Sequence, residues 1–200
     1  KKKIEIFNKK PLKTFAPYRL LKTMRAGVLV LGPLLAKYRI AKVSLPGGCA
    51  IGSRPIDIHL DALKKMKAKI KIKDGYIFAS AKRGLKGCTI KFPKISVGAT
   101  ENILIAACFA KGETKLRNCA SEPEIADLIN FLKKLGCNIS QIGKRSINVL
   151  GVEKSKPLNS TDVCCATTRG SPFESYARRR AGSQRVSYAS VARRKKAAAS

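Results

Sequence analysis

Segments with the two-residue alternation of β-strands alternate with longer segments of helical spacing along the first 150 residues. The predicted strands are residues 2–7, 41–45, 88–92 and 114–118. The predicted helices are residues 20–37 (with a break or restart at Gly32–Pro33), 55 to about 67, 97–111 and 121 to about 135. This alternation predicts an α/β fold.

Two strand pairs complete the pattern. AKIKI (68–72) and YIFASA (76–81) flank Lys73-Asp74-Gly75, which is a hairpin signal. CNISQI (137–142) and SINVLGV (146–152) form a second pair. Ser121 with Glu124 predicts a capping box at the start of the last helix.

The order helix–strand–helix–strand–strand occurs twice, roughly over residues 20–92 and 97–152. LKKMKAKI (63–70) matches LKKLGCNI (132–139) at an offset of 69, and AKVSL (41–45) matches TKLRN (114–118) at 73. The first copy is therefore about four residues longer, in the segment PGGCAIGSRP (46–55). We expect two stacked units that share a core within one domain, residues 1–156.

Residues 157–200 differ from the first part of the chain in composition and in hydrophobic periodicity. They lack a sustained helical or strand period and are rich in Ser, Ala and Arg. They are predicted to be a disordered, low-complexity basic tail. The favoured hypothesis is that this tail is non-native sequence after a frameshift or junction near Asp162, and an RNA-binding tail is the alternative.

Charge brings nucleic acid into consideration, because the formal net charge is +30. A basic nucleic-acid-binding protein is therefore one alternative function, although charge is its only support. The lysines of residues 64–73 are predicted to be a solvated face, so we expect no specific nucleic-acid partner.

The chain has seven cysteines and one histidine, His59, and it contains no CxxC pair. A zinc site, a disulfide framework and a Ser-His-Asp triad are therefore poorly supported, and no metal or cofactor is expected. The longest apolar run, residues 26–36, is shorter than the roughly 20 residues of a membrane helix. His59 is predicted to be structural, with contact to a site as the alternative. Four cysteines are predicted to be core thiols: Cys88, Cys108, Cys119 and Cys137.

Three segments carry a resemblance to a known family. TMRAGVLVLGPLLAKY continues to PGGCAIGSRPIDIHL within residues 23–60, and KISVGATENILIAA (94–107) and EPEIADLINFLKKLGCNI (122–139) follow. Over about residues 1–156 the chain resembles UDP-N-acetylglucosamine enolpyruvyl transferase. The resemblance implies one domain of an inside-out α/β structure built from βαβαββ units.

The resemblance also implies an activity. The family transfers the enolpyruvyl group of phosphoenolpyruvate to the 3-hydroxyl of UDP-N-acetylglucosamine and releases phosphate, the first committed step of peptidoglycan synthesis. It implies a cytoplasmic bacterial monomer that has these two substrates as its partners.

The family's functional residues map onto three segments of this chain. Cys49 matches the loop cysteine that donates a proton, forms an adduct with phosphoenolpyruvate and reacts with fosfomycin. Neighbouring cations can tune such a thiol, whose free pKa is about 8.5. Arg25 matches an anion-contacting position. The matched nucleotide-binding positions are Arg54, Pro55, Ile56, Asp57 and Ile58, and Lys94, Ile95, Ser96, Val97 and Gly98.

Two departures bear on activity. No counterpart is found for the family's N-terminal Lys-Asn pair, which contacts phosphoenolpyruvate, or for its second domain with the proposed aspartate base. Because the family's catalysis lies between two domains, we predict that this chain alone does not turn over. The alternative relative, the shikimate-pathway enolpyruvyl transferase, lacks the cysteine loop.

Overall fold

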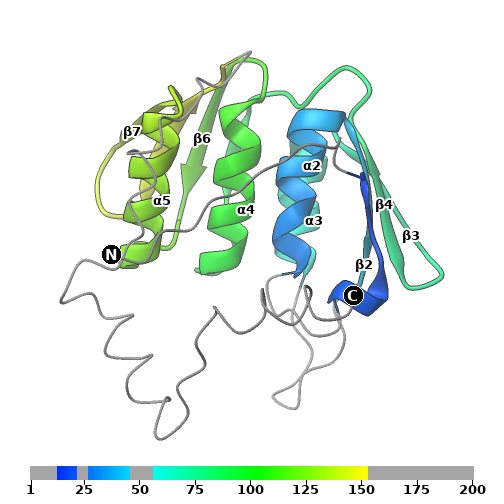
Figure 1. Ribbon diagram of the computed structural model, residues 1–200. Helices are drawn as coiled ribbons and strands as arrows, with labels where there is room; N and C mark the ends of the chain where they lie inside the picture. The colour runs from blue at the N-terminus through cyan, green and yellow to red at the C-terminus, as the bar shows by residue number, and fades with distance from the viewer. Residues whose placement is uncertain (1–12, 22–26, 46–55, 153–200) are drawn as a thin grey trace, which may run out of the picture. The chain divides into compact units, whose positions relative to one another are not determined.

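The computed structural model describes residues 13–21, 27–45 and 56–152. All of them lie in the first of the chain's two compact parts, residues 1–162. Within these ranges two four-stranded mixed sheets are each accompanied by helices, and the helices of the two sheets pack against one another (Figure 1). The predicted strand over residues 2–7 lies outside the described residues. No helix in the described part of the chain is long and apolar enough to cross a membrane.

The first sheet has the strand order β1-β2-β4-β3. Its first two strands are parallel and the other neighbours are antiparallel. The strands are β1 (Phe15–Ala16), β2 (Ile40–Ser44), β3 (Lys69–Lys73) and β4 (Tyr76–Ser80). The accompanying helices are α1 (Tyr18–Leu21), the 3-10 helix η1 (Gly27–Val30), α2 (Leu31–Tyr38) and α3 (Asp57–Lys65).

The second sheet repeats this arrangement with the order β5-β6-β8-β7 and the same strand directions. Its strands are β5 (Thr89–Lys91), β6 (Glu113–Arg117), β7 (Asn138–Gln141) and β8 (Ser146–Leu150). Its helices are α4 (Val97–Cys108) and α5 (Pro123–Lys134). Two βαβαββ units confirm the predicted α/β fold. β5 pairs with β6, so it opens the second unit, although we expected the first repeat to extend to residue 92.

The element bounds reproduce the offsets between the two repeats. β2 and β6 begin 73 residues apart, at Ile40 and Glu113. The helices α3 and α5 end 69 residues apart, at Lys65 and Lys134. The additional residues of the first unit therefore lie between β2 and the end of α3, where the cysteine segment is found.

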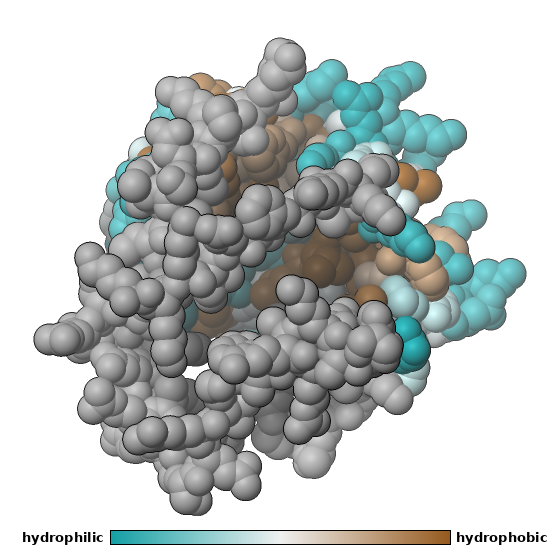
Figure 2. Space-filling view, in the orientation of Figure 1, coloured by the Kyte–Doolittle hydropathy of each residue, from teal (hydrophilic) through white to brown (hydrophobic). Residues whose placement is uncertain are grey.

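The predicted hairpin over residues 68–81 is present. Asp74 and Gly75 both have positive φ angles, 51° and 72°, as a tight hairpin turn between β3 and β4 requires. The lysines of β3, at positions 69, 71 and 73, are exposed. Figure 2 shows mainly hydrophilic residues at the side of the molecule where Figure 1 places this hairpin. These three lysines are therefore exposed to solvent.

The restart predicted near Gly32–Pro33 is present: the 3-10 helix η1 ends at Val30 and α2 begins at Leu31, with Pro33 in its first turn. Proline is tolerated there because the amides of the first turn have no intrahelical acceptor. The predicted start of the last helix is wrong in detail. Ser121 is not the cap of α5: Glu122 is, without a side-chain hydrogen bond, because Pro123 occupies the first helical position.

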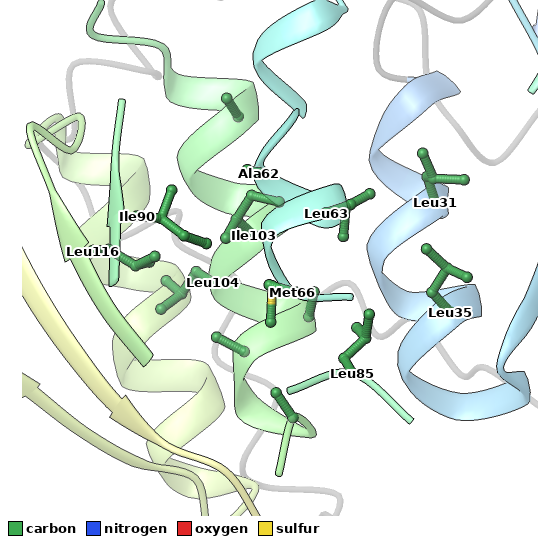
Figure 3. Close-up of a cluster of buried hydrophobic side chains, with 14 of the residues drawn as sticks. Leu31, Leu35, Ala62, Leu63, Met66, Leu85, Ile90, Ile103, Leu104 and Leu116 are labelled. Atoms are coloured by element: carbon green, nitrogen blue, oxygen red, sulfur yellow. The ribbon is translucent and has the colours of Figure 1, made fainter. Parts of the chain in front are cut away.

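The core lies where the helices of the two units meet. Figure 3 shows Leu31 and Leu35 of α2 and Ile103 and Leu104 of α4 in this core, and α4 packs directly against both α2 and α3. All four side chains are fully buried. Helix α4 is buried on several faces, which accounts for its apolar second half, ILIAAC. Burying one such side chain contributes about 1.5–3 kcal/mol, so the two units stabilise each other through α4.

Candidate functional site

The predicted site residues divide into two sets. Those outside the described residues are Cys49, Arg25, Arg54 and Pro55. Those within them are Ile56, Asp57, Ile58, Lys94, Ile95, Ser96, Val97 and Gly98. The described set forms the starts of two helices, α3 and α4.

The start of α3 carries the first three of these residues. Ile56 is the cap residue and is half-buried, and its carbonyl accepts hydrogen bonds from the amides of His59 (2.9 Å) and Leu60 (3.1 Å). Asp57 is exposed in the first turn, where the helix dipole favours a carboxylate. Ile58 is buried and belongs to the core. Of these three, Asp57 has the side chain most available to a ligand.

The start of α4 is held by its own cap. Ser96 has an extended backbone, and its Oγ accepts a hydrogen bond from the amide of Ala99 at 3.3 Å. Thr100 Oγ1 donates to the carbonyl of Ser96 at 2.8 Å and accepts from the amide of Ala120 at 3.1 Å. Lys94 and Ile95 are exposed immediately before this cap. The cap therefore fixes the backbone, while the lysine remains available at the surface.

The two helix starts are neighbours. A Cβ atom added at Gly98 would lie 3.6 Å from Cε1 of His59 and 3.7 Å from Cδ2 of Leu29 in η1. The structure thus brings α3, α4 and η1 together next to the predicted nucleotide segments. Helix N-termini present amides without intrahelical acceptors and a positive dipole end. With Lys94 beside one of them, this arrangement suits a phosphorylated ligand.

Acid–base groups are scarce at this location. His59 is 6% exposed, and burial lowers the pKa of its imidazole to about 4, so the ring is neutral at pH 7. Within the described ranges, no cluster of three or more His, Cys, Asp or Glu residues could hold a metal ion. The predicted proton donor, Cys49, lies outside the described residues.

The four described cysteines are unsuited to nucleophilic chemistry. Cys108, Cys119 and Cys137 are buried, and Cys88 is half-buried. Burial raises the pKa of all four thiols, that of Cys119 to about 11. They are thiols at neutral pH and three of them belong to the core, in agreement with the predicted structural role.

Asn102 is the residue near this site that the sequence reasoning missed. It is fully buried in α4 and contacts His59, with 3.0 Å between Asn102 Nδ2 and His59 Nδ1. The signal was present in the sequence: Asn102 stands directly before the apolar stretch ILIAAC (103–108), and a buried asparagine must find hydrogen-bond partners. Which partners it finds could not be read from the sequence.

Comparison with known proteins identifies the relatives of this chain. A family model described as EPSP synthase (3-phosphoshikimate 1-carboxyvinyltransferase) matches residues 1–168. UDP-N-acetylglucosamine 1-carboxyvinyltransferase of Pelagibacter ubique is 63% identical over 159 residues, which are 80% of this chain and 38% of that protein. The protein of the same name from Endomicrobium trichonymphae is 52% identical over 151 residues, 76% of this chain and 36% of that protein. The chain thus spans little more than a third of the length of these relatives.

Solved structures agree on the fold. The enolpyruvyl transferase NikO from Streptomyces tendae has a TM-score of 0.60 at 20% identity, covering 70% of this chain and 33% of that chain. EPSP synthase from Acinetobacter baumannii has a TM-score of 0.52 at 21% identity, covering 66% and 29%. Because the family model matches most of the sequence and the paired βαβαββ units match these folds, the chain belongs to the EPSP synthase family of enolpyruvyl (carboxyvinyl) transferases.

Proposed function

We propose that this chain is part of a UDP-N-acetylglucosamine enolpyruvyl transferase. The observation that carries the proposal is the 63% identity over 159 residues with the Pelagibacter ubique protein of that name. The reaction would transfer enolpyruvyl from phosphoenolpyruvate to the sugar 3-hydroxyl and release phosphate, in the bacterial cytoplasm, for peptidoglycan synthesis. The oligomeric state, expected to be monomeric, stays a prediction, as do the boundary near residue 156 and the origin of the tail.

The starts of α3 and α4 form the proposed nucleotide site. Residues 54–58 would contact the uridine nucleotide, and residues 94–98 would contact its diphosphate. Lys94 is exposed, and Ser96 caps α4, so a cation and first-turn amides are available to phosphate oxygens. The packing of α3 against α4, with His59 beside Gly98, supports one continuous site across the two helices.

Cys49 would supply the chemistry in this proposal. Its thiol would deliver a proton to phosphoenolpyruvate in the addition step and also form the covalent adduct, while Arg25 would lie near the bound substrates. The described thiols are buried or half-buried and have raised pKa values, so they are poor substitutes. The segment 46–55 that carries Cys49 is the one that distinguishes this reading from the shikimate-pathway relative.

The proposal is tested by titrating the 200-residue chain with UDP-N-acetylglucosamine and recording amide chemical shifts. We expect shifts that cluster at residues 54–58 and 94–98, and a loss of affinity of about 10- to 150-fold for Lys94→Ala, since one charge-assisted contact contributes about 1.5–3 kcal/mol. Lys133→Ala, on α5, is the matched control. Shifts elsewhere, or equal effects of the two substitutions, would contradict the assignment.

A second measurement concerns turnover. Because the relatives are almost three times longer than the matched region, we expect no enolpyruvyl transfer by the isolated chain above a Cys49→Ala control. Phosphate release measured with both substrates decides this point. A rate that depends on Cys49 would show that the matched region is sufficient for catalysis.

A further inference from the structure

Asn102 binds three separate segments of the chain through one buried amide group. Its Oδ1 accepts a hydrogen bond from the amide of Gly32 at 2.8 Å. Its Nδ2 donates to the carbonyl of Val28 at 3.4 Å and lies 3.0 Å from Nδ1 of His59. The partners come from α2, η1 and α3, so this side chain joins α4 to the three elements packed against its first half.

Only one orientation of the amide satisfies all three partners. If its oxygen and nitrogen were exchanged, the NH2 group would face the N–H of Gly32, and two donors would meet. With Oδ1 toward Gly32, Nδ2 must donate to His59 Nδ1, so the imidazole carries its proton on Nε2. Asn102 therefore fixes both the tautomer and the rotation of the His59 ring.

The orientation of this ring matters at the start of α4. The Cε1–Nε2 edge of His59 faces Gly98, where an added Cβ would lie 3.6 Å from Cε1 and 3.9 Å from Nε2. His59 is the third residue of α3, and Gly98 is the second residue of α4. The ring thus lies beside the start of α4, separated from Gly98 by a space that one methyl group would fill, and Asn102 holds it there.

We propose that Asn102 and His59 are positioning residues of the nucleotide site, which set the distance between the starts of α3 and α4 without touching the ligand. This inference rests on the proposed function. The network is buried, so removing the Nδ2 donor changes the proton position on His59 and leaves the carbonyl of Val28 without its donor. Movement of the elements around Asn102 relieves this unpaired carbonyl. A shift at either helix start would misplace the two segments relative to one ligand, whose uridine part contacts residues 54–58 and whose diphosphate contacts residues 94–98.

Asn102→Asp is the first test, with the complete 200-residue chain and UDP-N-acetylglucosamine as the probe. The carboxylate keeps an acceptor for Gly32 but no longer donates to His59. We expect the dissociation constant, measured at 10 °C on protein shown to be folded, to rise at least tenfold. Leu132→Ala is the matched control: it opens a cavity under α5 and lowers stability without touching this network, so its affinity should equal that of the wild type.

Two substitutions at His59 test the same proposal if the Asn102→Asp variant does not fold. His59→Leu removes the acceptor and should weaken binding, whereas His59→Gln offers an amide oxygen to Asn102 and should recover part of the affinity. Because His59 is the single histidine of the sequence, its ¹⁵N resonances report the tautomer directly. We expect the proton on Nε2 in the wild type and its loss from that position, or a charged ring, in Asn102→Asp.

The outcomes separate the two proposals. Wild-type affinity in folded Asn102→Asp, equal weakening by Leu132→Ala, or a wild-type proton on Nδ1 would each overturn the positioning role. If the wild-type chain does not bind the sugar nucleotide at all, the proposed function fails for this chain. The positioning role is then decided by the amide shifts of residues 56–58 and 96–98, and unchanged shifts in the folded Asn102→Asp variant would overturn it.

Discussion

Acidification should destabilise this protein through one side chain, His59. The ring is buried, and its pKa falls from an ordinary 6.5 to about 4 because the charged form loses its hydration. The folded state therefore holds His59 neutral, whereas the unfolded chain protonates it below about pH 6.5. Between these two values the unfolded state binds more protons, so stability falls as the pH falls.

The size of the effect follows from the two pKa values. Each tenfold change in proton activity between them is worth about 1.4 kcal/mol, so the full loss is about 3 kcal/mol, of which about 2 kcal/mol is lost by pH 5. The loss begins near pH 6.5 and ends near pH 4, below which both states are protonated. This is a large share of the stability of a small domain, which is about 5–15 kcal/mol.

Urea unfolding at a series of pH values between 7.5 and 4.5 measures this contribution. Carboxylates also titrate in part of this range. Burial and nearby Glu124 raise the pKa of Glu101, which acts in the opposite direction. The quantity to compare is therefore the wild type minus His59→Gln, in which these carboxylates are unchanged. A difference that stays constant over the range would refute the reasoning, as would a titration of His59 near 6.5 by NMR.

Other substitutions test close packing, buried hydroxyl groups and thiol reactivity. Gly32→Ala should cost about 1–3 kcal/mol in urea unfolding, because a Cβ there collides with the asparagine of α4; unchanged stability would contradict this packing. Thr114→Val should be neutral or stabilising by up to about 1 kcal/mol, since its buried hydroxyl has no hydrogen-bond partner among the described residues. Thr100→Val should instead cost about 1–3 kcal/mol, because its hydroxyl joins Ser96 to Ala120, and equal effects of the two changes would refute the comparison. Peptide mapping after iodoacetamide should show Cys49 modified before the four described cysteines, whose pKa values are raised; equal rates would count against a reactive loop thiol.

Much of the fold followed from the sequence because its signals are local. The alternation of β2 and β4 and the Asp74-Gly75 turn depend on neighbouring residues, and they predict the strands and the hairpin directly. The repeat offsets of 73 and 69 found in the sequence equal the offsets between the corresponding strands and helices, since an insertion in a connection leaves the flanking elements intact. The start of α5 was misjudged because two local signals competed there, and Pro123 prevailed over the Ser121 capping box.

For the candidate site, the sequence by itself determined the motifs and their order, and the family resemblance supplied their expected roles. Only the tertiary structure decided that the starts of α3 and α4 are neighbours, because packing between the two repeats brings these helices together. It also decided the partners of Asn102, which lie 43 to 74 residues away in the chain. A hydrogen bond over such a separation has no signature in local periodicity: the sequence specifies that a buried asparagine needs partners, and the packing of the helices determines which ones it has.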